Sequence, residues 1–175
     1  MKKITNKVLW QFAIGQLGWS MLSGIVSNWL VFFFQPSQEE LAKGQITFLP
    51  AGTFLGLTVI GMITAFGRIF DAVTDPYIAG KSDRCKHKLG RRIPFMRYAA
   101  LPFGLVTVLI FCSPVAGVSG WNTAALFVCL MLFYLCMTTY CTPYNALIPE
   151  LGRTQNARIN LSTFISVTYF FGIIH

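Results

Sequence analysis

Three charged residues lie at helical spacing beside an otherwise apolar stretch. Arg68, Asp71 and Asp75 are three and four residues apart, so on an α-helix they share one face. A charge in the middle of a bilayer costs about 2.5–3.5 kcal/mol on insertion scales, and such residues therefore face a polar interior. We expect Arg68 to neutralise one carboxylate and the remaining negative charge to hold a cation.

Either Na⁺ or H⁺ would suit this predicted cation site. Na⁺ takes several oxygen ligands, which the two carboxylates, the hydroxyl of Thr74 and backbone carbonyls offer. A proton would instead need a carboxyl group that stays protonated near neutral pH. The alternative is a structural salt bridge near the cytoplasmic end of the helix, where side chains reach water. Two acids exceed what one arginine can pair, and this favours the cation site.

A second polar set lies near the N-terminus. Gln16, Ser20, Ser23 and Ser27 are four, three and four residues apart, and Trp19 flanks them. Lipid offers no hydrogen-bond partner, so such a stripe faces either a solute cavity or another helix. The serines suit both interpretations equally. Gln16 favours the cavity, because it is larger and costs more to bury unpaired.

A third polar set surrounds Pro143. A proline frees a backbone carbonyl that nearby hydroxyls can satisfy, which is one interpretation of Thr138 and Thr139. The other is that these threonines complete the cation site or contact solute. We expect this set to face the first helix across a cavity and to bind a polyhydroxylated solute. The predicted solute contacts are Gln16, Trp19, Ser20, Ser23, Tyr140, Tyr144 and Asn145.

Composition places these residues in a membrane protein. Apolar residues make up 54% of the 175 residues and charged residues only 11%. Four stretches contain no Asp, Glu, Lys or Arg: 8–38, 44–67, 98–149 and 159–175. Because about 20 apolar residues cross a bilayer as a helix, this pattern excludes a soluble globular domain, a disordered chain and a secreted disulfide scaffold. It predicts an all-α integral membrane protein.

The predicted architecture is about five transmembrane helices in one partial bundle over residues 1–175. The helices are expected at residues 9–34, 54–79, 96–112, 121–147 and 160–175. The fifth is expected to be cut short. We therefore interpret the chain as the N-terminal fragment of a longer transporter-like protein whose C-terminal half is absent.

The cations alternate between the connections. They crowd the N-terminus and the loop at residues 80–97, whereas the loop at residues 35–53 carries Lys43 alone. This positive-inside pattern places the N-terminus and the basic loop in the cytoplasm, as for a multi-pass protein of the inner (plasma) membrane. It also accounts for the net charge of +8, so no nucleic-acid partner is expected. The cysteines lack metal-type spacing, and no cofactor or metal is expected beyond the coupling ion.

The segment Gly67–Phe95 resembles the signature of a known transporter family. Its two linked motifs are DAVTDP and GKSDR followed by GRR, and they resemble those of the glycoside–pentoside–hexuronide:cation symporters, the family of the melibiose permease. That family belongs to the major facilitator superfamily. The resemblance implies twelve helices in two bundles, alternating access, and a solute bound between this bundle and a C-terminal six-helix half.

The resemblance also implies roles for single residues. Asp71 and Asp75 would hold the coupling cation, with Thr74 between them and Thr138 contributing a hydroxyl. The cytoplasmic loop would be a gating element whose arginines pair with acidic groups on neighbouring helices in one conformation. The residues of this predicted gating loop are Gly80, Asp83, Arg84, Gly90, Arg91 and Arg92.

The chain departs from the melibiose permease at the sugar site. A charged pair on the first helix is replaced by Trp19 and Ser20, and an aspartate shared by sugar and cation is replaced by Cys141. A sugar-stacking tryptophan is replaced by Asn145, and an arginine usual in the fifth helix by an apolar residue near Ile165. The residues expected to bind the cation therefore match the family pattern, whereas those expected to bind the sugar do not.

These observations predict a secondary active transporter that couples Na⁺ or H⁺ to a sugar or glycoside-like solute. The alternatives are a non-sugar solute, a transporter-like sensor and an inactive truncated fragment. A membrane enzyme is not expected, because no water-activating set accompanies the two aspartates, and the only histidines are His87 and His175. The expected partners are a small-molecule solute and the lipid bilayer.

Overall fold

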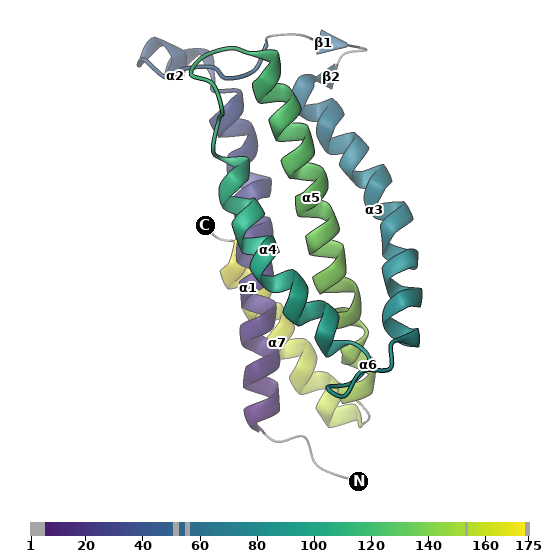
Figure 1. Ribbon diagram of the computed structural model, residues 1–175. Coiled ribbons are helices and arrows are strands. Elements are labelled where there is room, and N and C mark those ends of the chain that lie inside the picture. Colours follow the sequence, from purple (N-terminus) through teal and green to yellow (C-terminus); the bar gives the residue numbers. More distant parts are fainter. Residues whose placement is uncertain (1–5, 51–52, 55–56, 153, 174–175) are drawn as a thin grey trace.

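The computed structural model describes residues 6–50, 53–54, 57–152 and 154–173, and in this part of the chain five long helices form a bundle (Figure 1). They are α1 (Asn6–Phe34), α3 (Val59–Arg84), α4 (Ile93–Ile110), α5 (Gly120–Asn145) and α7 (Gln155–Ile173). The connections contain two short helices, α2 (Gln38–Ala42) and α6 (Leu147–Leu151). Two-residue strands, β1 (Thr53–Phe54) and β2 (Leu57–Thr58), pair antiparallel with Thr53 opposite Thr58. The all-α prediction is confirmed.

All five long helices differ somewhat from their predicted bounds, and two of them begin five residues away from the predicted start. The second, predicted at residues 54–79, begins at Val59 because the Thr58 side chain caps it by accepting a 3.2 Å hydrogen bond from the Gly61 amide. It continues past Pro76 to Arg84, with Ile78 and Ser82 buried in the bundle. The last helix, predicted from residue 160, begins at Gln155, where the Thr154 hydroxyl accepts from the Ala157 amide at 3.3 Å.

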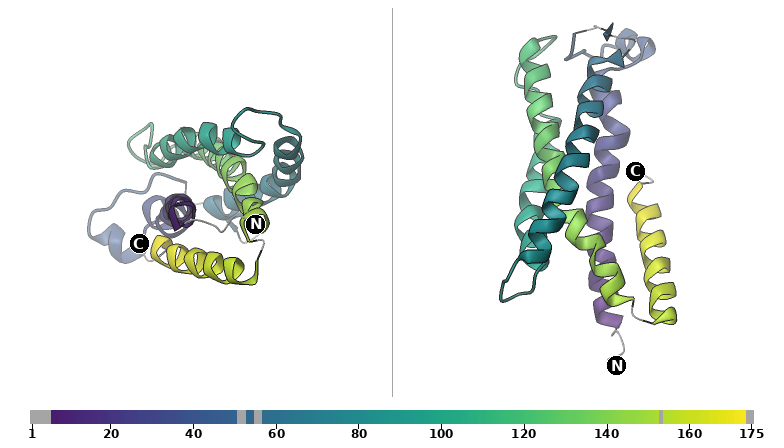
Figure 2. Two further views of the ribbon diagram at one scale, coloured as in Figure 1. Left: turned by 90° about the horizontal axis from the view of Figure 1, so that it is seen from below. Right: turned by 90° about the vertical axis from the view of Figure 1, so that its right-hand side faces the viewer.

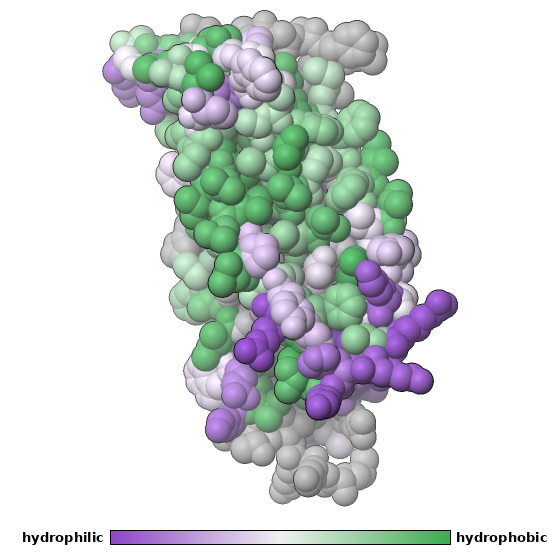
Figure 3. All heavy atoms as spheres, viewed as in Figure 1, coloured by the Kyte–Doolittle hydropathy of each residue, from purple (hydrophilic) through white to green (hydrophobic). Residues whose placement is uncertain are grey.

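Among the described residues, three helical segments are long and apolar enough to cross a membrane. They are Lys7–Phe34, Ile93–Ile110 and Gly120–Leu151. The other two long helices, α3 and α7, have 26 and 19 residues but carry more polar side chains. A broad hydrophobic band covers the bundle between its two ends, as Figure 3 shows. The fold is that of an integral membrane bundle in which α3 is the helix that carries Arg68, Asp71 and Asp75.

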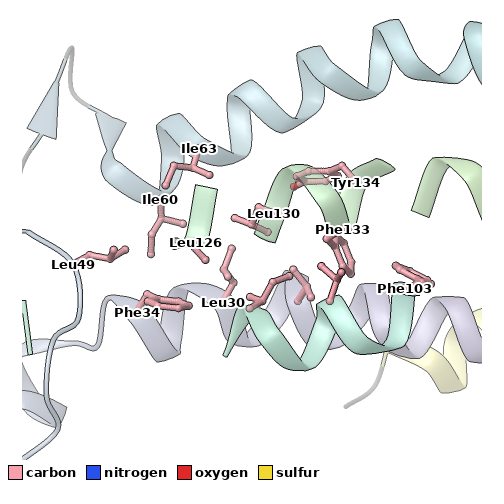
Figure 4. Close-up of a cluster of buried hydrophobic side chains, with 13 residues drawn as sticks. Leu30, Phe34, Leu49, Ile60, Ile63, Phe103, Leu126, Leu130, Phe133 and Tyr134 are labelled. Carbon is pink, nitrogen blue, oxygen red and sulfur yellow. The ribbon is translucent and has the colours of Figure 1, made fainter. Parts of the chain in front are cut away.

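The main core lies where α5 meets α4, α3 and α1. Leu130 is completely buried, and Phe103 and Phe133 pack with ring centroids 5.1 Å apart (Figure 4). A second cluster, which includes Leu9 and Leu161, joins the beginnings of α1 and α7. In a bilayer such contacts stabilise the bundle by van der Waals packing, since lipid is as apolar as the core.

The helix ends alternate between the two faces of the bundle as the predicted topology requires. The start of α1, the α3–α4 loop and α6 lie at one end, whereas α2, the two strands and the α4–α5 loop lie at the other (Figure 1). We call the first of these the α6 end. Helix α7 lies beside the N-terminal half of α1 and stops about halfway along it (Figure 2).

Candidate functional site

Two aspartates of α3 pair with two threonines of α5. The Thr138 hydroxyl donates to Asp71 Oδ1 at 3.1 Å, and the Thr142 hydroxyl donates to Asp75 Oδ1 at 3.2 Å. Both pairs are 67 residues apart in sequence. The helices run in the same direction, so the same four-residue spacing on each makes the two hydrogen bonds repeat one turn apart. We call these four residues the Asp–Thr ladder.

The ladder depends on a close approach of α3 and α5. Gly67 lies one turn before Asp71, and a Cβ atom added there would lie 2.1 Å from the ring of Tyr134. Because no side chain fits in that space, only glycine lets the Tyr134 ring pack on α3. The contact sets the separation at which Thr138, one turn after Tyr134, reaches Asp71.

Thr74 lies on the same side of α3 as the ladder. Its hydroxyl donates to backbone carbonyls of its own helix, at 3.0 Å to Phe70 and 3.4 Å to Asp71. The hydroxyl oxygen therefore keeps lone pairs that a cation can use. Across the described ranges, no three His, Cys, Asp or Glu side chains gather as a metal site would require. A cation here would be held by the two carboxylates and neighbouring hydroxyls.

The expected neutralisation of an aspartate by Arg68 does not take the form of a direct ion pair. Its guanidinium carbon lies 5.9 Å from the centroid of the Tyr134 ring, in a cation–π arrangement, and no Arg68–aspartate ion pair occurs in the described structure. The aspartates turn toward the α5 hydroxyls instead. Arg68 lines a groove of about 370 Å³ between α1, α3 and α5, together with the hydroxyl-bearing Ser23, Ser27 and Thr64.

The polar stripe of α1 divides between packing and this groove. Ser20 is completely buried, its hydroxyl donates to the Leu17 carbonyl at 3.0 Å, and it packs against Gly172 of α7. Gln16 is also buried. Trp19 is half-buried, with its ring centroid 6.0 Å from that of Tyr169. Of the predicted α1 solute residues, only Ser23 lines the groove.

The predicted cavity between α1 and the Pro143 region is filled by aromatic rings. Tyr144 stacks on Phe12 with centroids 4.5 Å apart, and Tyr140 stacks on Tyr144 at 5.8 Å. The Tyr144 hydroxyl donates to the Phe12 carbonyl, and that of Tyr140 to the Gly15 carbonyl. The two helices therefore touch where a cavity was predicted. Asn145 is exposed at the end of α5.

Arg92 connects three segments at the α6 end. Its guanidinium lies 3.2 Å from Asp83 at the end of α3 and 3.0 Å from Glu150 of α6, and it donates to the Ala146 carbonyl. Arg91 pairs with the same Glu150 carboxylate at 3.2 Å. The Arg92 side chain is only 13% exposed. Arginines of the predicted gating loop thus meet acidic groups of neighbouring helices.

Comparison with known proteins gives the family. Residues 11–174 match the family model described as MFS/sugar transport protein. The chain belongs to the MFS/sugar transport family. This is a family of transporters and not of enzymes.

Individual relatives of this family are named as symporters. The chain is 30% identical to an uncharacterized symporter of Synechocystis, sll1374, over 87% of this chain and 26% of that protein. It is 26% identical to the uncharacterized symporter YnaJ of Bacillus subtilis, over 93% and 32%. The putative glycoside/cation symporter YagG of Escherichia coli is 33% identical, over 53% and 20%. The chain thus spans at most about a third of these relatives. No solved structure matches it.

Two residues that contact the predicted sites of this MFS/sugar transport chain were not predicted from the sequence. Thr142 follows Thr138 by four residues, as Asp75 follows Asp71, and this matched spacing was the signal for a second pair. Glu150 is the only acid after Asp83 in the sequence, which made it the nearest available partner for the loop arginines. Gly80 and Arg84, which were predicted in the gating loop, are exposed.

Proposed function

We propose that the chain forms part of a secondary active transporter that couples Na⁺ or H⁺ to uptake of a sugar or glycoside-like solute by alternating access. The Asp–Thr ladder carries this proposal, because it places two carboxylates and two hydroxyls together where α3 meets α5. Intramembrane carboxylates that face the bundle interior are typical of ion pathways. Family membership and the symporter names of the relatives support the same class of activity.

The proposed cation ligands are Asp71, Asp75, Thr138 and Thr74. The Thr138 hydroxyl donates its proton to a carboxylate oxygen of Asp71. When Na⁺ binds, the same hydroxyl can present a lone pair to the ion while the carboxylates compensate its charge. H⁺ would instead bind one carboxyl oxygen directly. Because Arg68 is turned to the groove, both carboxylates are available to the ion.

The proposed solute path runs through the groove between α1, α3 and α5. Ser23, Ser27 and Thr64 offer hydroxyls, Arg68 offers a fork of donors, and Tyr134 offers a ring face. Hydroxyls beside an aromatic ring suit a polyhydroxylated solute. Gln16 and Trp19 lie on the same helix as Ser23, toward the end where α1 begins. We propose that they support the solute site from that side.

The proposed gate is the Arg92 cluster at the α6 end. Its ion pairs hold α3 and α6 together, and an opening of the bundle at this end would have to separate them. We place this end in the cytoplasm of a cell with the protein in its inner membrane, following the positive-inside rule. The charges on the two loops at the opposite end support this orientation, since Lys43 is the only cation there.

Transport by the full-length protein in proteoliposomes tests the proposal. A set of labelled glycosides is offered with an inward Na⁺ gradient, with an inward H⁺ gradient, and with neither. Accumulation that follows one gradient identifies the ion. Uptake of a glycoside without a response to either gradient would exclude symport, and absence of uptake across sugar and non-sugar solutes would favour a sensor or an inactive fragment.

A further inference from the structure

The loop between α3 and α4 borders a shallow, open hollow of about 590 Å³ at the α6 end of the bundle. Four cationic side chains line it, those of Arg84, Lys86, Lys88 and Arg91, against a single carboxylate, that of Asp83. We call this feature the basic hollow. The hydrophilic residues gathered at this end stand beside the hydrophobic band in Figure 3.

Positive charge in the basic hollow exceeds what the neighbouring acids compensate. Asp83 pairs with Arg92, and Glu150 pairs with Arg91 and Arg92. Within the described part of the chain, Arg84, Lys86 and Lys88 take part in no ion pair. Holding several like charges around one hollow is unfavourable without an anion, so the arrangement favours an anionic ligand.

The backbone fixes the shape of the basic hollow. Gly90 has a φ of +104°, a left-handed conformation that side-chain-bearing residues rarely adopt. Its amide donates to the His87 carbonyl at 3.0 Å, and the Leu89 amide donates to His87 Nδ1 at 3.2 Å. The cations are therefore presented from a defined turn.

Exposed apolar side chains adjoin the charges. Leu89 and Ile93 are each 48% exposed, although one lies in the loop and the other begins α4. Tyr98 and Tyr77, on the two helices that the loop joins, are also exposed, and tyrosine is enriched where membrane helices meet the headgroups. A ligand that fits has an anionic group with an apolar body beside it.

We propose that the basic hollow binds the phosphate group of an anionic phospholipid, whose acyl chains continue along α3 and α4 next to Leu89 and Ile93. Clusters of four or more cations directly beside a membrane helix attract anionic headgroups. The positive-inside rule explains the sign of this loop. It does not explain why four of these cations line one hollow while the exposed Leu89 and Ile93 lie next to them in the chain.

The test compares lipid binding by two charge-matched variants of the full-length protein. One is Arg84→Gln/Lys86→Gln/Lys88→Gln, inside the hollow. The control is Lys7→Gln/Lys81→Gln/Arg97→Gln, which removes the same charge from exposed positions outside it. Native mass spectrometry in detergent measures binding of dioleoylphosphatidylglycerol, with dioleoylphosphatidylcholine as the neutral lipid. We expect the hollow variant to bind phosphatidylglycerol about tenfold more weakly and the control to stay within about twofold of the wild type.

Further measurements distinguish binding of a phospholipid from binding of a soluble phosphate. Inorganic phosphate and glycerol phosphate are offered to the wild type, and a Leu89→Gln/Ile93→Gln variant is tested with the lipid. We expect weak binding of both soluble anions and weaker lipid binding by the variant. Equal binding of glycerol phosphate and phosphatidylglycerol would overturn the lipid assignment, and so would equal losses in the two charge variants. If the triple variant does not fold, Lys86→Gln alone, with Lys81→Gln as its control, gives the same comparison.

Discussion

The Thr142 hydroxyl donates to Asp75 one helical turn beyond the point where Thr138 donates to Asp71. Asp71 and Asp75 therefore each have their own hydroxyl on α5. A hydrogen bond to a charged group is stronger than one between neutral groups, so each pair holds its carboxylate in place. The two aspartates differ in burial, since Asp71 is half-buried and Asp75 is exposed. We expect them to contribute unequally to ion binding.

Neutralising the aspartates tests cation coupling. In the full-length protein we expect Asp71→Asn and Asp75→Asn each to abolish accumulation of solute against its gradient, because each removes a charge that compensates the cation. Exchange of solute at equal ion concentrations is expected to survive, since exchange needs no net ion movement. Both are measured in proteoliposomes, and normal accumulation by both variants would make the aspartates structural.

Removing one hydroxyl at a time tests the ladder. We expect Thr138→Val to lower cation affinity about three- to tenfold, the equivalent of one hydrogen bond in a membrane protein. Thr142→Val should have a smaller effect, because its partner Asp75 is more exposed. Thr138→Ser and Thr142→Ser keep the hydroxyl and serve as controls. Calorimetric titration with the ion gives the affinities, and an unchanged affinity in Thr138→Val would remove that hydroxyl from the cation site.

Arg92 is expected to stabilise the α6 end. Arg92→Gln removes the ion pairs to Asp83 and Glu150 from a side chain that is mostly buried, and we expect a loss of about 2 kcal/mol in unfolding free energy. Arg84→Gln, at an exposed position of the same loop, should change it by less than about 0.5 kcal/mol. Thermal unfolding in detergent compares the two variants. Equal melting temperatures would contradict the prediction that Arg92 stabilises the α6 end.

The solute site is tested on α1 and α3 together. We expect Trp19→Ala, Gln16→Ala and Arg68→Gln to weaken solute binding while cation binding remains. Arg68→Gln should have the largest effect, because Arg68 lines the groove whereas Gln16 is buried. Calorimetry with and without Na⁺ separates the two affinities. Unchanged solute affinity in the α1 variants would leave the polar stripe as helix packing, as already observed for Ser20.

Two native cysteines test the orientation. Cys85 follows α3 at the α6 end, whereas Cys112 is exposed after α4 at the other end. In single-cysteine variants, an impermeant maleimide added to intact cells should label Cys112 and spare Cys85. Inverted membrane vesicles should give the opposite pattern. Labelling of Cys85 from outside would reverse the proposed topology.

The sequence predicted which face each residue lies on better than it predicted what that face meets. Spacing alone placed Asp71 and Asp75 together, and the resemblance added Thr138; both agree with the geometry. Arg68 shares their spacing, yet it lies over Tyr134, a partner 66 positions away that only the packing of α3 on α5 supplies. Local spacing contains no information on that choice.

Tyr140 and Tyr144 show the same limit. A polar and aromatic face looks identical in sequence whether it borders a cavity or another helix. Their hydroxyls instead satisfy carbonyls of α1, more than 120 residues away in sequence. Helix bounds shifted for a related reason. The capping hydroxyl of Thr154 lies before the apolar stretch 159–175, and that of Thr58 lies within the stretch 44–67, where hydropathy does not mark a helix start.

The repeat of the Asp–Thr ladder has a consequence for the alignment of α3 and α5. A slip of one turn, about 5.4 Å, would place Thr138 opposite Asp75 or Thr142 opposite Asp71, so either slipped alignment keeps one of the two hydrogen bonds. The hydrogen bonds alone therefore distinguish three alignments poorly. Tyr134 distinguishes them sharply, because a slip would move its ring from Gly67 onto Ile63 or Asp71, where a side chain occupies the space. The space that Gly67 leaves for the Tyr134 ring thus selects the single alignment in which both carboxylates are paired.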